Sequence, residues 1–463
     1  MLAATPDHVS REGAGATADT HLIDRPSTNG LRCGMSRYLV DGSFPLNGTI
    51  KASGNKNAAL PCIAATLLTD EEVVLSNIPD IEDVSVMLDV LRSFGASVET
   101  TGPGIYRIKM SDVKSSDVPP EYAKKIRASI LFAGPLLART GKATLPPPGG
   151  DVIGRRRLDT HFLAFSSLGA RVEVDGLFRL TANKLVGVNL FLDEASVTAT
   201  ENAIMVAVLA EGQTVIENAA SEPHVQDLCN MLNQMGATIS GIGSNILRIT
   251  GVDKLHGTEF RIGSDFMEVG SFIGLAAVTR GELVIEDAGP QHLRMSKIAF
   301  AKLGIHWETD ANTVRVAPGQ SLKVVPDIGG MIPEIADAPW PGFPPDLTSI
   351  MTVVASQVEG TVLIHEKMFE SRMFFVDKLI GMGARIILCD PHRAVVSGPA
   401  RLKASDLVSP DVRAGMALVI AALCAEGRSC IDNVYQIERG YERLIPRLKQ
   451  LGAHIERVGD DTE

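Results

Sequence analysis

The sequence predicts an α/β fold, in the mixed α+β sense, built from six repeats of one supersecondary unit. The first observation behind this prediction is a helix-like stretch that ends at a glycine between apolar residues and is followed by a strand-like stretch. This pattern occurs six times at intervals of 67 to 79 residues, at Gly95, Gly169, Gly236, Gly304, Gly383 and Gly452. A recurring period of this kind indicates repeated units that share a core.

A second pattern runs in step with the first and supports the same prediction. An alanine-rich helix end is followed by a glycine and then by a short apolar strand that closes on an acid or an asparagine. The pattern recurs around Gly141, Gly212, Gly281, Gly360 and Gly427, and Asp70-Glu71 replaces the glycine in the first unit. Each unit is therefore expected to run strand, helix, strand, helix, strand.

The unit at 196–250 shows why each element is expected. Pro223 suits the first turn of a helix and Gly236 suits its end, and between them the apolar residues fall on one face. The strands on either side are β-branched or alternate in polarity. In order, we expect a helix over 199–211, a strand over 214–216, a helix over 223–235 and a hairpin over 238–240 and 246–249.

The repeat does not determine how the six units are arranged, because a ring, a solenoid or two lobes of three would all satisfy it. The longest stretch expected to be irregular is 326–346, which carries six prolines and interrupts the fifth unit. Loops of this length are usually functional or disordered.

Composition limits the class of protein. The chain has 463 residues, of which 45% are hydrophobic and 21% charged, as in ordinary globular proteins of two or three domains. Its net charge of −11 argues against nucleic acid or an anionic membrane as a partner. No apolar run is long enough to cross a membrane. The six cysteines have no C-x-x-C spacing, which fits a reducing cytoplasm. We expect residues 1–35 to be a disordered extension, and Met35 could be the natural start.

Four segments do not serve the repeat. The first places Lys56 and Asn57 at the opening of an apolar helix, where an ammonium group and free N–H groups suit an anion. An asparagine cap beside a solvated lysine is the alternative. The second, at 146–159, has three prolines and two glycines before Asp151 and then three consecutive arginines, which suit phosphate or carboxylate. A neutral linker with a solvated charge run is the alternative there.

The other two segments add acids and cations. Asp346 closes the proline-rich stretch, and Arg372 and Arg413 each stand at the start of a helix-like run. The alternatives are an ordinary turn residue after proline and exposed arginines, which are common at such positions. With Lys56, Arg127, Arg156 and Asp151, these residues predict a cleft for a small, phosphate-bearing polyanion with carboxylates for acid and base chemistry. The sequence has no Walker A motif, no G-x-G-x-x-G after a strand, no Ser/His/Asp motif and no zinc motif, so neither a cofactor nor a metal is expected.

Five motifs carry a resemblance to a known family. The sequence resembles the enolpyruvyl transferases, in the branch that acts on UDP-N-acetylglucosamine, over about residues 36–460. The motifs are S-G-N-K-N-A-A-L-P at 53–61, P-G-G-D-V-I-G-R-R at 148–156, F-P-P-D-L at 343–347, F-E-S-R at 369–372 and R-G-Y-E-R at 439–443. The resemblance implies a two-lobed, inside-out α/β barrel of six βαβαββ repeats, three per lobe. It places one lobe at 56–264, including the mobile Pro-Gly loop, and the other at 36–55 plus 265–463.

The resemblance also implies a reaction. The enolpyruvyl group of phosphoenolpyruvate moves to the 3′-hydroxyl of UDP-N-acetylglucosamine and phosphate is released, in the first committed step of peptidoglycan synthesis in the cytoplasm. Both substrates are small molecules, and the oligomeric state remains open. The implied catalytic residues are Asp151 as general acid, Asp346 as base, Lys56 and Arg413. The implied contacts of phosphoenolpyruvate are Lys56, Asn57, Arg156 and Arg413. Those of the sugar nucleotide are Arg127, Arg156, Arg157, Leu158, Asp159, Thr160, Glu194, Ala195, Ser196, Val197, Asp346 and Met368, with Arg372 nearby.

Two positions depart from the family pattern. Many members carry cysteine where this chain has Asp151, so we expect an active enzyme that resists fosfomycin, which alkylates that thiol. Some members carry lysine where this chain has Glu194, and a carboxylate cannot assist a diphosphate. That change leaves open a transferase that acts on another nucleotide such as UMP. A non-catalytic paralogue that binds the sugar nucleotide and regulates is a further alternative.

Overall fold

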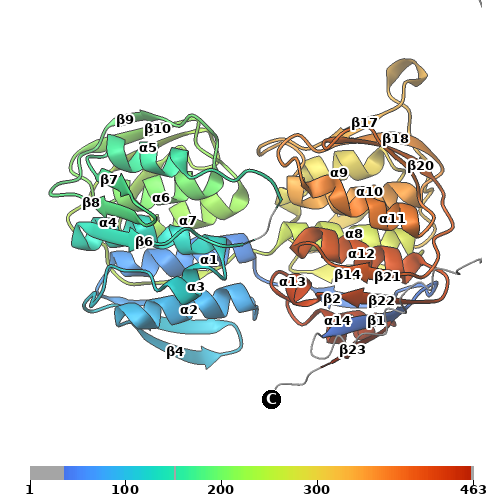
Figure 1. The fold of residues 1–463 in the computed structure, drawn as a ribbon, viewed down its shortest axis with the longest axis horizontal. Coiled ribbons are helices and arrows are strands. Elements are labelled where there is room, and N and C mark those ends of the chain that lie inside the picture. Colours follow the sequence, from blue (N-terminus) through green and yellow to red (C-terminus); the bar gives the residue numbers. More distant parts are fainter. Residues whose placement is uncertain (1–35, 151–152, 460–463) are drawn as a thin grey trace, which may run out of the picture.

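The computed structural model describes residues 36–150 and 153–459, which form two lobes side by side (Figure 1). Each lobe has its own hydrophobic core. One core draws its residues from Ala58 to Ile262, and the other from Tyr38 to Ala52 and from Phe266 to Ile455. The expected disorder of residues 1–35 and the candidate acid Asp151 lie outside the described residues.

The first lobe contains three sheets. Its two four-stranded sheets each combine one parallel pair with antiparallel neighbours, and its third sheet is antiparallel. In spatial order they are β13 (Thr258–Arg261), β3 (Glu72–Ser76), β5 (Ile105–Lys109) and β4 (Ser97–Gly102); β6 (Lys142–Leu145), β8 (Phe178–Thr181) and β7 (Arg171–Val174); and β11 (Thr238–Ser240), β12 (Ile246–Thr250), β10 (Gln213–Glu217) and β9 (Asn189–Phe191).

The second lobe repeats this plan with three four-stranded sheets, each with one parallel pair. In spatial order they are β21 (Asp406–Val408), β22 (Arg428–Asp432), β1 (Arg37–Asp41) and β23 (His454–Val458); β15 (Glu308–Asp310), β16 (Thr313–Val316), β14 (Leu283–Glu286) and β2 (Gly48–Lys51); and β17 (Glu334–Ala336), β18 (Gly360–His365), β20 (Arg393–Gly398) and β19 (Arg385–Leu388).

The helices fall into the same two groups. The first lobe has α1 (Lys56–Ala65), α2 (Glu82–Phe94), α3 (Pro120–Ala123), α4 (Ala133–Thr140), α5 (Asp159–Ser167), α6 (Val197–Ala207) and α7 (Pro223–Gln234). The second has α8 (Phe266–Val278), α9 (Arg294–Ala301), α10 (Thr348–Ser356), α11 (Val376–Gly381), α12 (Val412–Cys424), α13 (Tyr435–Glu438) and α14 (Leu444–Gln450). The short 3-10 turns are η1 (Thr66–Leu68), η2 (Arg127–Phe132), η3 (Pro290–His292), η4 (Ile328–Gly330), η5 (Pro345–Leu347) and η6 (Arg372–Phe375).

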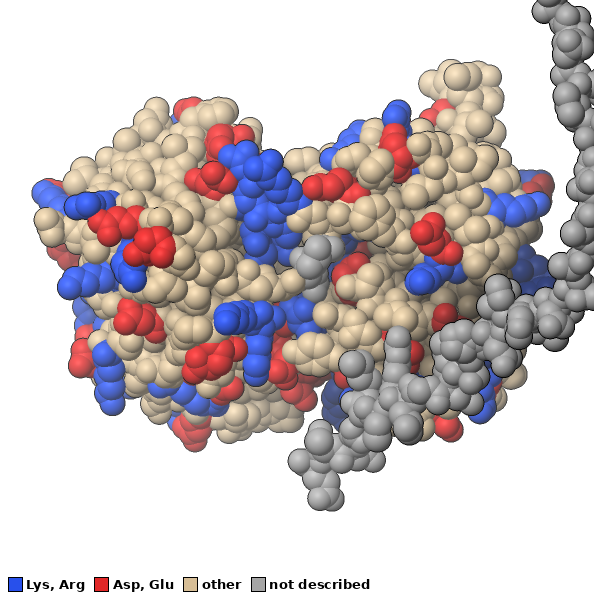
Figure 2. All heavy atoms as spheres, viewed as in Figure 1, with Lys and Arg blue, Asp and Glu red and all other residues tan. Residues whose placement is uncertain are grey.

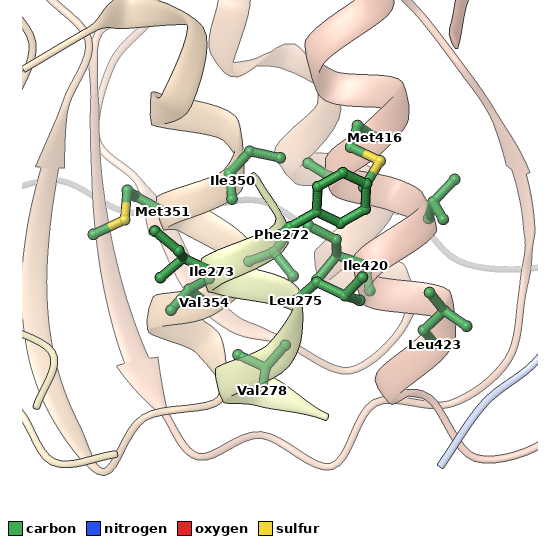
Figure 3. Close-up of a cluster of buried hydrophobic side chains, with 14 of the residues drawn as sticks. Phe272, Ile273, Leu275, Val278, Ile350, Met351, Val354, Met416, Ile420 and Leu423 are labelled. Carbon is green, nitrogen blue, oxygen red and sulfur yellow. The ribbon is translucent and has the colours of Figure 1, made fainter. Parts of the chain in front are cut away.

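The centre of the second lobe is made of helices. Every residue of α8 and α10 is buried, and these helices pack against α12 (Figure 3). Gly274 permits this close approach, because a Cβ there would lie 3.0 Å from Val354 Cγ2 and 3.1 Å from Ile350 Cγ2. The apolar residues of one central helix therefore meet other helices inside the lobe, and the sheets cover the outside.

The glycines that define the first repeat pattern confirm its physical basis. Gly95, the C-cap of α2, has φ 105°, and all six glycines of the pattern have positive φ between 68° and 105°. A residue without a Cβ adopts this conformation at no steric cost, so it ends a helix efficiently. Gly281, from the second pattern, serves differently: a Cβ there would lie 1.7 Å from the carbonyl oxygen of Leu46.

The expectations for the unit at 196–250 are confirmed by β10, α7, β11 and β12. The expected helix over 199–211 is only partly correct, because α6 begins two residues earlier and ends at Ala207. The stretch 326–346 corrects one expectation, because it is not wholly irregular. It contains β17, whose Ile335 is buried and pairs in parallel register with Ile364. A strand of three residues is too short to produce a recognisable polarity pattern.

The chain crosses between the lobes twice, and the two crossing segments lie against each other. Asn55 N donates to the carbonyl oxygen of Gly263 at 2.8 Å, and Asp265 N donates to that of Ser53 at 2.9 Å. These paired crossings lead directly into α1 and α8. They bring the beginnings of both helices to the boundary between the lobes.

Candidate active site

Lys56 is the first residue of α1, at the first crossing between the lobes. Asn55 caps the helix, since its side-chain oxygen accepts from Asn57 N at 2.8 Å. A cation at a helix N-terminus is unfavourable to the helix dipole, so Lys56 does not serve the helix. The lysine is not a solvated charge either. Its side chain is 12% exposed, and Nζ lies 2.7 Å from Asp83 Oδ2.

Asp83, in the first turn of α2, holds a second cation from the other lobe. Arg439 Nε donates to Asp83 Oδ1 at 2.8 Å, and Arg439 Nη2 donates to Oδ2 at 3.3 Å. Burial opposes ionisation of Asp83, but Lys56 and Arg439 outweigh it and lower the pKa of the carboxyl. A charged, buried contact therefore joins the two lobes.

Asp346 also lies between two cations, both in the second lobe. Arg372 Nη2 donates to its Oδ1 at 3.0 Å, and Arg413 Nε donates to its Oδ2 at 3.0 Å. Burial opposes ionisation, but the guanidinium groups of Arg413 and Arg372 outweigh it and hold the pKa of Asp346 well below its usual range. The carboxylate is ionised at neutral pH.

The two arginines at Asp346 retain unused donors. Arg372 Nε and Nη1 and Arg413 Nη1 are buried and have no hydrogen-bond acceptor among the described residues. Burying an N–H without a partner is costly, so such donors mark a position where an anion would be stabilised. Arg413 follows Asp411, whose carboxylate caps α12 by accepting from Arg413 N at 2.8 Å.

The third group of predicted residues follows the Pro-Gly loop. Arg127, at the start of η2, donates through Nη2 to the carbonyl oxygens of Arg156 at 2.6 Å and Arg157 at 3.3 Å. Burial, and next the neighbouring Arg156, lower the pKa of Arg127 to about 10, and Glu194 acts in the opposite direction. Arg157 is exposed and pairs with Asp159 at 2.8 Å. Leu158 directly precedes α5.

The remaining predicted residues of the first lobe lie near this arginine group. Thr160 Oγ1 donates to Asp193 Oδ1 at 2.7 Å, which ties α5 to the segment after β9. Ser196 precedes α6, and its N–H donates to the carbonyl oxygen of Glu194 at 2.7 Å. Ala195 and Val197 flank it. The negative charge of Glu194 acts on Arg127 and Arg157, so this departure from the family pattern faces the arginines.

Contacts between the lobes bring these groups to one boundary. Arg155 N donates to Glu370 Oε1 at 2.9 Å, and Ser371 N donates to the carbonyl oxygen of Ile153 at 3.2 Å. His224 of the first lobe is buried, which lowers its pKa to about 4, and the charges of Asp346 and Arg413 act on it. Figure 2 shows a patch of Lys and Arg side chains beside the notch between the lobes. Met368 lies between β18 and η6, in the same segment as Glu370.

Sequence reasoning gave no role to several residues of these clusters. Arg439 begins the R-G-Y-E-R motif at 439–443, and no other feature of the sequence pointed to it. Asp83 resembled an ordinary acid in the first turn of a helix. Asp265 lies 3.9 Å from Arg413 and caps α8, and Glu366 lies 3.7 Å from Arg372. The ionic partners of Asp83 and Asp265 are distant in sequence, so no local pattern could reveal those pairs. Glu366 and Arg372 belong to one short segment after β18, where no helical or strand spacing predicts their contact.

Within residues 36–150 and 153–459, no group of three or more His, Cys, Asp or Glu side chains could hold a metal ion. In the same part of the chain, no helix is long and apolar enough to cross a membrane.

The class of protein follows from the fold and from a family model. A model described as EPSP synthase (3-phosphoshikimate 1-carboxyvinyltransferase) matches residues 40–448. The structure resembles the enolpyruvyl transferase NikO from Streptomyces tendae, with a TM-score of 0.83, 23% identity and coverage of 92% of this chain and 100% of that one. It also resembles EPSP synthase from Acinetobacter baumannii, with a TM-score of 0.72, 18% identity and coverage of 92% and 100%. These likenesses confirm the two-lobed α/β fold of the carboxyvinyl transferases.

Closer relatives identify the branch. The chain is 69% identical over 422 residues to a UDP-N-acetylglucosamine 1-carboxyvinyltransferase from Treponema denticola, which covers 91% of this chain and 99% of the relative. It is 61% identical over 425 residues to the protein of the same name from Borreliella burgdorferi, covering 92% and 99%. The chain belongs to the UDP-N-acetylglucosamine 1-carboxyvinyltransferase family, which confirms the resemblance.

Proposed function

We propose that this chain transfers the enolpyruvyl group of phosphoenolpyruvate to the 3′-hydroxyl of UDP-N-acetylglucosamine and releases phosphate, the first committed step of peptidoglycan synthesis. The observation that carries the proposal is Asp346, a carboxylate held between Arg372 and Arg413, which both keep unused N–H donors. A base beside free guanidinium donors suits an alcohol that attacks an anionic substrate. Identity of 69% to a named enzyme of this activity supports the same conclusion.

The reaction is an addition followed by an elimination. Asp346 takes the proton of the 3′-hydroxyl as its oxygen bonds to C2 of phosphoenolpyruvate, and Asp151 protonates the methylene carbon. Loss of a proton from the resulting methyl group and of phosphate from C2 restores the double bond. Lys56, Asn57, Arg156 and Arg413 hold the phosphate and carboxylate, and their fixed charges stabilise the tetrahedral intermediate without rearrangement.

Substrate binding would activate the base. Burial opposes ionisation of Asp346, but Arg413 and Arg372 outweigh it and hold the pKa of the carboxyl well below its usual range, so the carboxylate is a weak base. An anion that draws the guanidinium groups toward itself removes part of this stabilisation, and the pKa of Asp346 rises. The base therefore becomes effective when phosphoenolpyruvate is present.

The sugar nucleotide is assigned to the boundary between the lobes. Arg127 and residues 156–160 would bind its diphosphate together with residues 194–197, while Met368 lies near the uracil. We assign the lobes to 56–264 and to 36–55 plus 265–463, since the two hydrophobic cores divide in this way. Each lobe would move as one body when the boundary closes on substrate.

The deciding experiment is phosphate release from phosphoenolpyruvate with UDP-N-acetylglucosamine, for the wild type and Asp151→Asn. We expect release by the wild type and its loss in the variant, because the amide cannot donate a proton to carbon. Faster phosphate release with UMP would support a transferase that acts on another nucleotide, and Glu194 would then be the first residue to examine for the change in specificity. Tight binding of UDP-N-acetylglucosamine without any release would support a regulatory protein.

Fosfomycin gives an independent test of position 151. Aspartate lacks the thiol that fosfomycin alkylates, so the wild type is expected to retain activity after incubation with the compound. Asp151→Cys is the matched control, because it restores the thiol at the same position and should become sensitive. Rapid inactivation of the wild type would contradict the assignment.

A further inference from the structure

Two acids follow the adjacent parallel strands β17 and β18. Asp337 comes directly after β17 and Glu366 directly after β18, and the register pairs Ala336 with His365. The two acids therefore leave the sheet at the same edge, next to η6. Both are buried, with exposed fractions of 1% for Asp337 and 0% for Glu366. Neither has a role in the proposed reaction.

Each carboxyl group has one oxygen satisfied by the main chain and one that is not. Asp337 Oδ1 accepts from Lys367 N, and Glu366 Oε1 accepts from Phe369 N at 3.2 Å. The bond from Lys367 N places the Asp337 carboxyl group against the residue that directly follows Glu366, and its charge disfavours ionisation of Glu366. Their other oxygens, Asp337 Oδ2 and Glu366 Oε2, have no donor among the described residues. One proton held between the two groups would supply the missing donor and remove the repulsion of two buried charges.

Arg372 lies between this pair and the proposed base. Its Nη2 donates to Asp346 at 3.0 Å, whereas its Nε lies 3.7 Å from Glu366 Oε2, which is too far for a hydrogen bond. Burial, and then the charge of Asp337, raise the pKa of Glu366 to about 9 against the opposing effect of Arg372. An ionised Glu366 would attract the guanidinium group into a paired, charge-assisted contact and draw it away from Asp346.

We propose that Asp337 and Glu366 act as a positioning pair for Arg372: because they share one proton, they leave the guanidinium group directed at Asp346 and at the anionic substrate. The proposal deepens the proposed function and rests on it for its kinetic consequences. The shared proton itself can be tested on the ligand-free protein.

Several charged or titratable groups surround Glu366 and belong to the same equilibrium. His392 Nδ1 lies 2.7 Å from the main-chain oxygen of Glu366, and His365, at the end of β18, pairs with Glu334 at 2.7 Å. Asp337, directly after β17, disfavours ionisation of Glu366, whereas Arg372 in η6 and Thr348 in α10 favour it. Ionisation of Glu366 would be felt first at Arg372, the cation closest to it.

The kinetic test compares Glu366→Gln with the wild type between pH 7 and pH 10. Glutamine keeps the shape and neutrality of a protonated glutamate, so at pH 7.5 the KM for phosphoenolpyruvate and kcat should stay within about threefold of the wild type. Above about pH 9 the wild-type KM should rise by roughly tenfold, whereas that of the variant should not. A loss of a hundredfold or more at pH 7.5, on the order of 3 kcal/mol, would overturn the proposal, because it would mean that the carboxylate is needed.

A thermal-unfolding test does not depend on catalysis. The pKa of Glu366 is higher in the folded protein than in the unfolded chain. The bound proton therefore stabilises the folded protein fully at a pH below the pKa of the unfolded chain, and this stabilisation is lost as pH rises through about 9. The Tm of Glu366→Gln minus that of the wild type should therefore increase from pH 5 to pH 9. Glu359→Gln, at an exposed carboxyl of the same lobe paired with Lys323, is the matched control and should show a constant difference. A constant difference for Glu366→Gln as well would refute the shared proton.

Asp337→Asn gives a second route if Glu366→Gln does not fold. Removal of the neighbouring charge should lower the pKa of Glu366, so the rise of KM with pH should begin at a lower pH than in the wild type. An unchanged pH profile would contradict the proposal. A wild type that releases no phosphate would instead defeat the proposed function, and the Tm comparison would still decide whether the proton is shared.

Discussion

Two carboxylates of the candidate site, Asp83 and Asp346, are each held by two cations, and their surroundings differ. Asp83 joins Lys56 of its own lobe to Arg439 of the other, and its side chain is 4% exposed. Asp346 lies between Arg372 and Arg413 within the second lobe, and its side chain is 21% exposed. In the candidate site, a carboxylate between two cations therefore joins the two lobes at Asp83 and forms a partly exposed cluster within the second lobe at Asp346.

The difference shows which of the two clusters can exchange partners. An anion can draw the arginines of the Asp346 cluster without separating the lobes, because they retain donors without acceptors. Displacing Asp83 would instead break its ionic contact with Arg439 of the other lobe. An ammonium group has three N–H donors, so Lys56 can hold Asp83 and still bind a substrate anion.

The largest effect expected from this comparison is on catalysis. Asp346→Asn removes the proposed base, so kcat for phosphate release should fall by about 10²- to 10⁴-fold. The unfolding free energy should fall less than in Asp83→Asn, because Asp265 remains near Arg413 and the Asp346 side chain is partly exposed. Asp390→Asn, which removes a carboxylate that pairs with Arg393 in the same lobe, is the control and should keep full activity. Equal activity of the two variants would remove Asp346 from the mechanism.

The second effect is on stability. Asp83→Asn leaves Lys56 and Arg439 buried without their carboxylate, so the unfolding free energy should fall by about 3–5 kcal/mol in urea denaturation. Asp89→Asn provides the control on the same helix, because Asp89 forms an exposed pair with Arg92 and should contribute less than about 1 kcal/mol. If both variants lose the same small amount, Asp83 does not tie the lobes together.

A third carboxylate sharpens the comparison because it is held by the main chain. Asp227 Oδ2 accepts from Gly263 N at 2.9 Å, at the second crossing between the lobes. Burial raises the pKa of Asp227 to about 6, although this hydrogen bond and the charge of Arg261 act to lower it. Stability from its bound proton is present below the unfolded pKa near 3.8 and is lost as pH rises through about 6. Asp227→Asn should therefore gain about 1–3 kcal/mol relative to the wild type between pH 4 and pH 7. A difference that does not change with pH would show that Asp227 is ionised throughout.

The smallest effect concerns the exposed arginine group. Glu194 offsets part of the charge of Arg127 and Arg157, so Glu194→Gln should lower the KM for UDP-N-acetylglucosamine by roughly two- to fivefold with kcat unchanged, the size of one exposed ion pair. Glu211→Gln, at an exposed pair with Lys184 in the same lobe, should leave KM unchanged. A higher KM in Glu194→Gln would mean that the carboxylate contacts the nucleotide favourably.

The sequence by itself determined the repeated unit and the local geometry of the candidate site. The six glycines at helix ends were identifiable because a positive φ is a demand on a single residue. Lys56 was a candidate because a cation stands at the start of an apolar helix, whereas Arg413, at a commonplace position for an arginine, was a candidate mainly through the family resemblance. For the glycines and for Lys56, the information lies within a few residues of the position concerned.

Only the tertiary structure decided which charges meet and which groups hold protons. Asp83 and Arg439 are 356 residues apart, and Asp337 meets Glu366 through a strand of three residues that gives no pattern. Three groups illustrate the consequence: Asp346 has a depressed pKa, whereas Asp227 and Glu366 have raised ones. An isolated carboxyl would ionise alike in each case, and the difference arises because folding removes water and sets the nearest charge.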